Sequence, residues 1–103
     1  MTVYVDDAML KYGRMKMCHL IADTDEELHE IARLIGVARK WHQAPPEHDS
    51  HYDICASMRK KAVELGVVEI SYRECGCMNA RRRVTGELGE PIEAISWFKN
   101  NML

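Results

Sequence analysis

The fold is decided by one stretch, MKMCHLIADTDEELHEIARLIG (residues 15–36), in which a strand pattern passes directly into a helix pattern. The first part alternates between two faces that are both mostly apolar, which is typical of a central strand. Thr24 and Glu27 then have the spacing of a capping box, in which each side chain satisfies a free backbone N–H of the first helical turn. An apolar stripe with i, i+3, i+4, i+7 spacing follows, and Gly36 ends it. The stretch therefore predicts a central strand and then a helix over residues 25–35.

A first strand precedes this unit, and a loop follows it. TVYVDD, residues 2–7, alternates as a strand. The link from it to residue 15 is short, which favours antiparallel pairing, because a parallel crossover needs about a dozen residues or more. VARKWHQ, residues 37–43, is compatible with a further short strand. The two prolines within residues 44–49 predict a loop.

The second half of the chain predicts two more helices. Ser50 and Asp53 have the spacing of a second capping box, which predicts a helix over residues 51–65. The remaining segments are an alternating strand in residues 67–73, an irregular stretch in residues 74–90, and a helix over residues 91–101 that Pro91 begins.

The order of these elements is ββα(β)αβα. It predicts an α/β fold, with α+β as the alternative, in which about three helices pack on a single small mixed sheet. A length of 103 residues fits one domain spanning residues 1–103. No apolar run reaches the ~18 residues of a membrane span and no signal peptide is recognisable, so we expect a cytoplasmic protein without a membrane partner. The net charge of -2 argues against polyanion binding by the chain as a whole. The oligomeric state stays open.

The main candidate site lies in SHYDICASMRKKA, residues 50–62. If a helix begins at Ser50, its free N–H groups and positive field form an anion site. His51, Tyr52 and Arg59 would then add donors around a phosphate or carboxylate. The alternative is structural, with a capping pair that only begins the helix and half-exposed residues in its first turn.

Acidic and imidazole groups elsewhere could join this site. Asp6 and Asp7 end the first strand, where paired carboxylates hold a hard cation, supply a general base, or simply form a turn. His19 lies within an apolar strand and is either a core histidine or, with Asp6 and His51, part of a two-histidine, one-carboxylate metal set. The catalytic candidates are therefore Asp7, His19, His51 and Asp53, and a divalent metal is the one cofactor that this pattern suggests.

Two further side chains suit a planar ligand. The ring of Trp41 can stack on such a ligand, and the amide of Gln43 can bind a base or amide edge. In the alternative interpretation, Trp41 closes the core beside the proline loop. The ligand-binding candidates are thus Trp41, Gln43, Tyr52 and Arg59.

The stretch that follows residue 73 carries two short motifs. Cys75 and Cys77 resemble half of a zinc site, but such a site needs four ligands, and the other two cysteines lie in a predicted strand and on a helix face. We therefore expect thiols. The basic run of Arg81, Arg82 and Arg83 could contact nucleic acid or phosphate, or could form a solvated edge.

Several of these motifs together resemble a small domain of phages and bacteria, catalogued as domain of unknown function 4031. They are VYVDD, the run from Met17 to Gln43, and HYDI with Arg59. The resemblance covers about residues 2–72 and leaves residues 73–103 as a tail particular to a subset. The family's recurring polar positions correspond here to Asp6, Asp7, His19, Asp23, His29, Trp41, Gln43, His51, Tyr52, Asp53 and Arg59.

The resemblance implies a phage or prophage origin, and it hints at nucleotide or phosphate chemistry, since the domain is joined in some bacterial proteins to an HD-type phosphohydrolase domain. We therefore expect a polar pocket for a phosphate-bearing small molecule or nucleotide, with hydrolysis as its chemistry if the protein is an enzyme. The alternative is a non-catalytic protein that binds a host protein or, through Arg81, Arg82 and Arg83, nucleic acid. Convergence of Asp6 or Asp7 with His19 and one of residues 51–53 would favour the first function.

Overall fold

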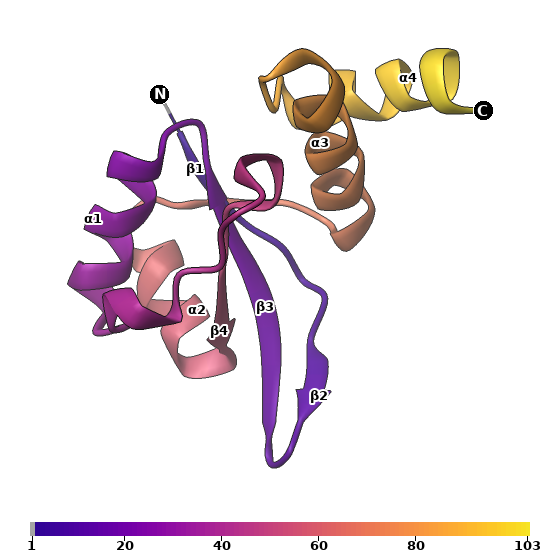
Figure 1. The fold of residues 1–103 in the computed structure, drawn as a ribbon. Helices are drawn as coiled ribbons and strands as arrows, with labels where there is room; N and C mark the ends of the chain where they lie inside the picture. The colour runs from indigo at the N-terminus through magenta and orange to yellow at the C-terminus, as the bar shows by residue number, and fades with distance from the viewer. Residues whose placement is uncertain (1) are drawn as a thin grey trace.

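The computed structural model describes residues 2–103, and these residues form one mixed five-stranded sheet and four α-helices (Figure 1). The strands are β1 (Val3–Val5), β2 (Leu10–Tyr12), β3 (Met15–Ala22), β4 (Tyr52–Cys55) and β5 (Val68–Glu69). The helices are α1 (Asp25–Ile35), α2 (Ala56–Glu64), α3 (Tyr72–Thr85) and α4 (Pro91–Met102). The predicted α/β class is confirmed, with one helix more than expected.

The central strand is β3, as its apolar pattern predicts. β1 and β2 both pair with it antiparallel, and β4 pairs antiparallel with its other edge, so that Leu20 lies opposite both Val5 and Tyr52. β5 pairs parallel with β1. The antiparallel pairing expected for the first two predicted strands is therefore confirmed, and β2 occupies part of the link between them.

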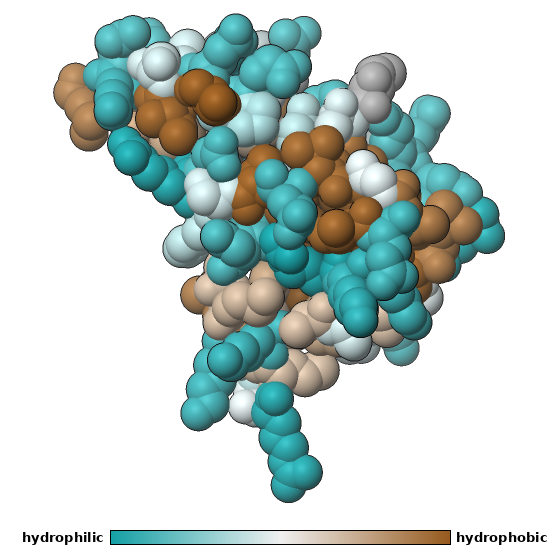
Figure 2. Space-filling view, turned by 180° about the vertical axis from the view of Figure 1, so that it is seen from behind, coloured by the Kyte–Doolittle hydropathy of each residue, from teal (hydrophilic) through white to brown (hydrophobic). Residues whose placement is uncertain are grey.

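The helices cover the sheet from both sides, with α1 and α2 on one face and α3 and α4 on the other (Figure 1). The alternation of β3 explains these two cores. Cys18 and Leu20 pack with α1 and α2 in one buried cluster, whereas Ile21 packs with α3 and α4 in the other. Figure 2 shows hydrophilic side chains projecting from the end of the molecule where β2 and β3 meet. No helix within residues 2–103 is long and apolar enough to cross a membrane.

The α1 helix begins and ends as predicted. The hydroxyl of Thr24 accepts a hydrogen bond from the backbone N–H of Glu27 at 3.2 Å, and Gly36 ends the helix with a φ of 88°. The reciprocal half of the predicted capping box is not formed, because the carboxylate of Glu27 accepts from the Thr24 hydroxyl at 2.8 Å and not from the Thr24 backbone N–H. Leu28, Ala32 and Ile35 are buried on the predicted stripe.

The helix predicted for residues 51–65 is wrong at its start. Residues 52–55 form β4, and α2 begins only at Ala56 without a side-chain cap. Pairing with β3 satisfies the backbone groups here, and the burial alternates as in a half-buried strand. Because no helix begins at Ser50, the anion site expected at that helix start is also wrong.

Three more segments differ from expectation. The strand predicted for residues 67–73 is limited to β5, because residues 72 and 73 already belong to α3. The stretch 74–90, predicted to be irregular, contains most of α3, which a complete capping box between Ser71 and Glu74 begins. The segment 37–43 is not a strand but contains a 3₁₀ turn at Arg39–Trp41, followed by a single bridge from Gln43 to His51.

Candidate functional site

The alternation of β4 and the bridge before it sends neighbouring polar side chains to opposite faces of the sheet. Ser50 and Tyr52 turn toward α1, where each forms a hydrogen bond to an α1 side chain. His51 and Asp53 turn the other way, and His51 lines a pocket together with residues of α3. This alternation explains why a histidine and a tyrosine stand between Ser50 and Asp53 in the sequence.

On the face of α3, five side chains form the α3-side site: Asp6, His19, His51, Asp53 and Cys75. Asp6 is fully buried, and its Oδ2 lies 2.7 Å from Nδ1 of His19. Its Oδ1 accepts the backbone N–H groups of His19 and Ala8 at 2.8 and 3.2 Å. The ring of His19 is therefore held with Nδ1 toward Asp6, and its Nε2 lies 3.8 Å from Oδ1 of Asp53.

The second imidazole is held in a similar way. Nδ1 of His51 is hydrogen-bonded to the backbone carbonyl of Asp49, and Nε2 lies 3.4 Å from the same Oδ1 of Asp53. The other oxygen of Asp53 accepts from the side-chain amide of Gln43 at 2.8 Å. Two imidazoles thus point Nε2 at one oxygen of a carboxylate that is 39% exposed. The predicted convergence of Asp6, His19 and residues 51–53 is confirmed as geometry.

Both imidazoles have a pKa raised above that of an ordinary histidine. The hydrogen bond to Asp6 raises the pKa of His19, against the opposing effect of burial. Burial acts to lower the pKa of His51, but Asp53 and the neighbouring Asp49 outweigh it and raise that pKa. His51 in turn lowers the pKa of Asp53. Burial acts to raise the pKa of Asp6, yet its hydrogen bonds hold that pKa below the usual range.

The free energy of unfolding is therefore expected to peak in weakly acidic solution. A histidine whose folded pKa exceeds the ordinary 6.5 stabilises the fold below that pH, and this contribution is lost as the pH rises through the folded pKa. Asp6 and Asp53 have a folded pKa below the ordinary 3.8. They stabilise the fold above pH 3.8, and this contribution is lost as the pH falls through the folded pKa. The melting temperature, followed by circular dichroism, should fall as the pH rises above 6.5. An equal fall in a variant with His19→Gln and His51→Gln would contradict this assignment.

A pocket of about 370 Å³ opens between the two imidazoles and the start of α3. The ring of Tyr72 stacks on His19 with centroids 5.8 Å apart and an interplanar angle of 7°. The other lining residues are His51, Asp49, Cys75, Gly76 and Asn79. The sequence analysis does not select Tyr72, Gly76 and Asn79, because it predicts a strand over residues 67–73 and an irregular stretch after it. The S-x-x-E spacing of residues 71–74 is the signal that could have revealed the helix.

A second, more apolar pocket of about 540 Å³ lies on the other side of Asp53. Trp41 and Gln43 line it together with Tyr12 of β2, Met15 and Met17 of β3, and Val37 from the loop after α1. The Trp41 ring is 61% exposed, so it presents a face to the pocket instead of closing the core. The two ligand-binding candidates from this segment therefore lie next to the α3-side site.

Other predicted residues make contacts that hold the fold. The carboxylate of Asp7 accepts the backbone N–H of Tyr72 at 2.8 Å, at the start of α3. The guanidinium of Arg59 donates to the Asp6 carbonyl at 2.8 Å and to Glu69 at 3.1 Å. Tyr52 is buried on the opposite face of β4. We therefore leave these three out of the chemistry proposed for the α3-side site.

The basic run does not present three free cations. Arg82 donates to the backbone carbonyls of His48 and Ser50, at 2.7 and 3.1 Å, and to Asn79. Its guanidinium thereby fastens α3 to the loop before β4. A surface contact with nucleic acid through all three arginines is not favoured by this arrangement.

The metal set predicted from Asp6, His19 and His51 differs from the group that the structure brings together. Asp6, His19 and Cys75 place one ligand atom each within 4.8 Å of one another, so Cys75 takes the place expected for His51. However, Asp6 and His19 already form a 2.7 Å hydrogen bond, and burial together with Asp6 raises the pKa of the Cys75 thiol. A metal here would have to displace the proton shared by Asp6 and His19 and also remove the thiol proton of Cys75. Acid–base chemistry therefore fits this site better.

The fold and the α3-side site define a small mixed α/β protein with two imidazoles around one carboxylate. Over residues 3–82 the chain matches the model of a family described as protein of unknown function (DUF4031), and it belongs to that family. The match extends beyond residue 72, the expected end of the common part, and includes Tyr72 and Cys75. Searches of the curated proteins and of the solved structures found no significant match.

Proposed function

We propose that this protein hydrolyses a phosphate ester of a small molecule, with a nucleotide as the preferred class, at the α3-side site. The observation that carries the proposal is the pair of anchored imidazoles, whose Nε2 atoms lie 3.8 and 3.4 Å from the same oxygen of Asp53. Because a positive charge on His51 opposes protonation of His19, one imidazole of the pair serves as the acid while the other, unprotonated, serves as the base.

The chemistry follows from this pairing. One imidazole accepts a proton from a water molecule as the water oxygen forms a bond to phosphorus. The other donates a proton to the leaving oxygen as its bond to phosphorus breaks, so that an alcohol and a phosphate are released. Asp6 is fully buried and holds the ring of His19 through its Oδ2, so it is a positioning residue. The protonated imidazole offsets the charge of Asp53 where the phosphate would bind.

The apolar pocket supports a substrate with a planar part. Trp41 presents an exposed ring beside two methionines, and Gln43 adds an amide that also contacts Asp53. Because Asp53 contacts both imidazoles and lines this pocket, a ligand with its ring against Trp41 would reach the imidazoles with its phosphate.

The test is phosphate release from a panel of nucleoside monophosphates, cyclic nucleotides and a chromogenic aryl phosphate, measured against pH. We expect release from at least one nucleotide, with a bell-shaped dependence of kcat/KM on pH, because one imidazole must be protonated and the other free. The absence of release from every member of the panel at all pH values would overturn the proposal.

Trp41→Ala is expected to raise KM for a nucleotide about tenfold with little change in kcat, since stacking of a base on an aromatic ring contributes about 1–3 kcal/mol. Steady-state kinetics of the two proteins would measure this. Trp97→Ala, on α4 and away from this pocket, is the matched control and should leave KM unchanged. Equal effects of the two substitutions would remove Trp41 from the binding site.

A further inference from the structure

A second group of imidazoles and carboxylate lies on the opposite face of β4, against α1. Asp25 and His29 are four residues apart on α1 and so project from the same side of the helix. His42 reaches them from the loop after the 3₁₀ turn, and the rings of His29 and His42 lie 4.5 Å apart at an angle of 83°. One ligand atom from each of Asp25, His29 and His42 lies within 4.8 Å of the other two. We call these three residues the α1-side cluster.

Each ring of this cluster is oriented by a buried hydroxyl of the segment before or within β4. Nδ1 of His29 lies 2.7 Å from the hydroxyl of Tyr52. Nε2 of His42 lies 2.8 Å from Oγ of Ser50, and that hydroxyl donates to Oδ1 of Asp25 at 2.6 Å. Because the Ser50 proton goes to a carboxylate, Oγ accepts from His42, and the other nitrogen of that ring keeps a free lone pair.

The contrast with the α3-side site is informative. There the closest pair, Asp6 and His19, is joined by a direct hydrogen bond. Within residues 2–103, no hydrogen bond or ion pair joins any two members of the α1-side cluster, although their ligand atoms converge. Converging side chains that are oriented by outer hydroxyls, and not by hydrogen bonds to one another, are the arrangement found around a metal ion.

We propose that Asp25, His29 and His42 bind one divalent transition-metal ion of the zinc class. Two imidazoles and one carboxylate are ligands of the type that zinc takes, and two ligands at i, i+4 on one helix face supply the spacing. Three protein ligands leave a fourth position open, as in catalytic rather than structural zinc sites.

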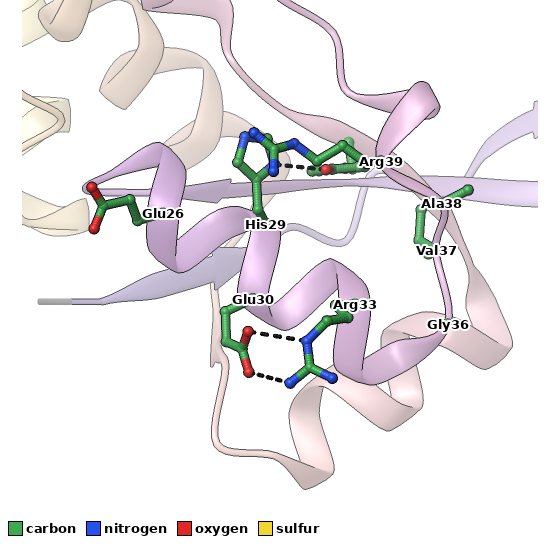
Figure 3. Close-up of a pocket in the computed structure, with 9 residues that line it drawn as sticks. Glu26, His29, Glu30, Arg33, Gly36, Val37, Ala38 and Arg39 are labelled. Carbon is green, nitrogen blue, oxygen red and sulfur yellow. Dashed lines mark hydrogen bonds and ion pairs between the residues drawn. The ribbon is translucent and has the colours of Figure 1, made fainter.

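A pocket borders the cluster at His29. A pocket of about 700 Å³ is lined by His29 and Tyr52 together with Arg33 and Arg39. Figure 3 shows the side chains of His29 and Arg39 close together at one side of this pocket, whereas Arg33 is paired with Glu30 on another side of α1. The free guanidinium nearest the cluster is thus that of Arg39, which suits an anionic group on the metal. The metal proposal does not depend on the hydrolysis proposed for the α3-side site.

Equilibrium dialysis of the untagged protein against zinc tests the proposal, with the bound metal measured by elemental analysis. We expect one zinc per chain, and at least a hundredfold weaker binding in His42→Ala. Tyr52→Phe removes only the outer hydroxyl and should weaken binding about 10–100-fold. His48→Ala, a histidine in the same loop but outside the cluster, is the matched control and should bind zinc normally.

Cobalt as a spectroscopic substitute for zinc separates the two faces of the sheet. An oxygen and nitrogen site gives cobalt bands without thiolate charge transfer, and these bands should persist in Cys75→Ser. If His42→Ala does not fold, Asp25→Asn, an exposed change on α1, serves as the ligand variant. No zinc binding, normal binding in the ligand variants, or a thiolate band that Cys75→Ser abolishes would each overturn the proposal.

Discussion

His51→Ala is expected to lower kcat for phosphate-ester hydrolysis by about 10²- to 10⁴-fold, the range that a positioned general acid or base supplies. Nε2 of His51 lies 3.4 Å from Asp53 and borders the pocket, so its removal eliminates one of the two proton-transferring groups. KM should change little, because Trp41 and Gln43 remain in place to bind the planar part of the substrate.

His19→Ala should cause a loss of similar size, and the double variant should lose little more than either single variant. Residues that act as one unit give strongly non-additive effects, since the reaction path that needs both groups is already closed by the first change. His48→Ala is the control, because this histidine lies outside the site. Purified variants assayed side by side, with folding checked by circular dichroism, measure the effect. Additive losses on a logarithmic scale would argue that the imidazoles act separately.

The parts of the fold that follow from local pattern were predictable. Thr24 and Gly36 mark the ends of α1. The apolar side chains between them fall on one face only if the segment is helical. The two apolar faces of β3 predict a central strand, and Leu20 indeed lies between Val5 and Tyr52. These features depend on residues close in sequence, so that periodicity and capping suffice.

The segment around Ser50 was misinterpreted because two structures fit the same residues. Ser50 and Asp53 have the spacing of a capping box, but they also fit the alternation of a strand, and pairing with β3 decides between them. That pairing joins residues more than thirty positions apart, which no local pattern reveals. The same long-range register placed His51 and Asp53 against His19, and Tyr52 against His29 on the other face.

The candidate site was predictable only in part. Asp6 and His19 could be chosen because ionisable groups within or beside an apolar strand are costly unless they are paired. His51 and Asp53 were candidates for other reasons, a helix start that the structure does not contain and the family resemblance. Their exact partners could not be chosen, since the 2.7 Å bond between Asp6 and His19 depends on the register of β1 against β3. Cys75 stood out only as part of a Cys-x-Cys motif, and its place beside Asp6 and His19 depends on the helix α3, which the sequence analysis did not predict.

Asp6→Ala is expected to lower the free energy of unfolding by about 3 kcal/mol. The fully buried carboxylate accepts from the ring of His19 and from the backbone N–H groups of His19 and Ala8. Its removal leaves these donors without an acceptor at the junction of β1 and β3. In a domain of this size the melting temperature should fall by roughly 15 °C, measured by thermal or urea unfolding.

The neighbouring Asp7→Ala provides the matched control for that loss. Asp7→Ala removes one exposed hydrogen bond, in which the Asp7 carboxylate accepts from the backbone N–H of Tyr72 at the start of α3. The expected loss in the free energy of unfolding is about 1 kcal/mol or less. Asp6→Asn keeps the side-chain volume and one oxygen acceptor, so it should fall between the two alanine variants. This order separates the loss of a buried acceptor from the loss of volume. Equal destabilisation by Asp6→Ala and Asp7→Ala would show that the buried carboxylate does not hold His19, because a positioning group at the centre of the site must cost more to remove than a cap at its rim.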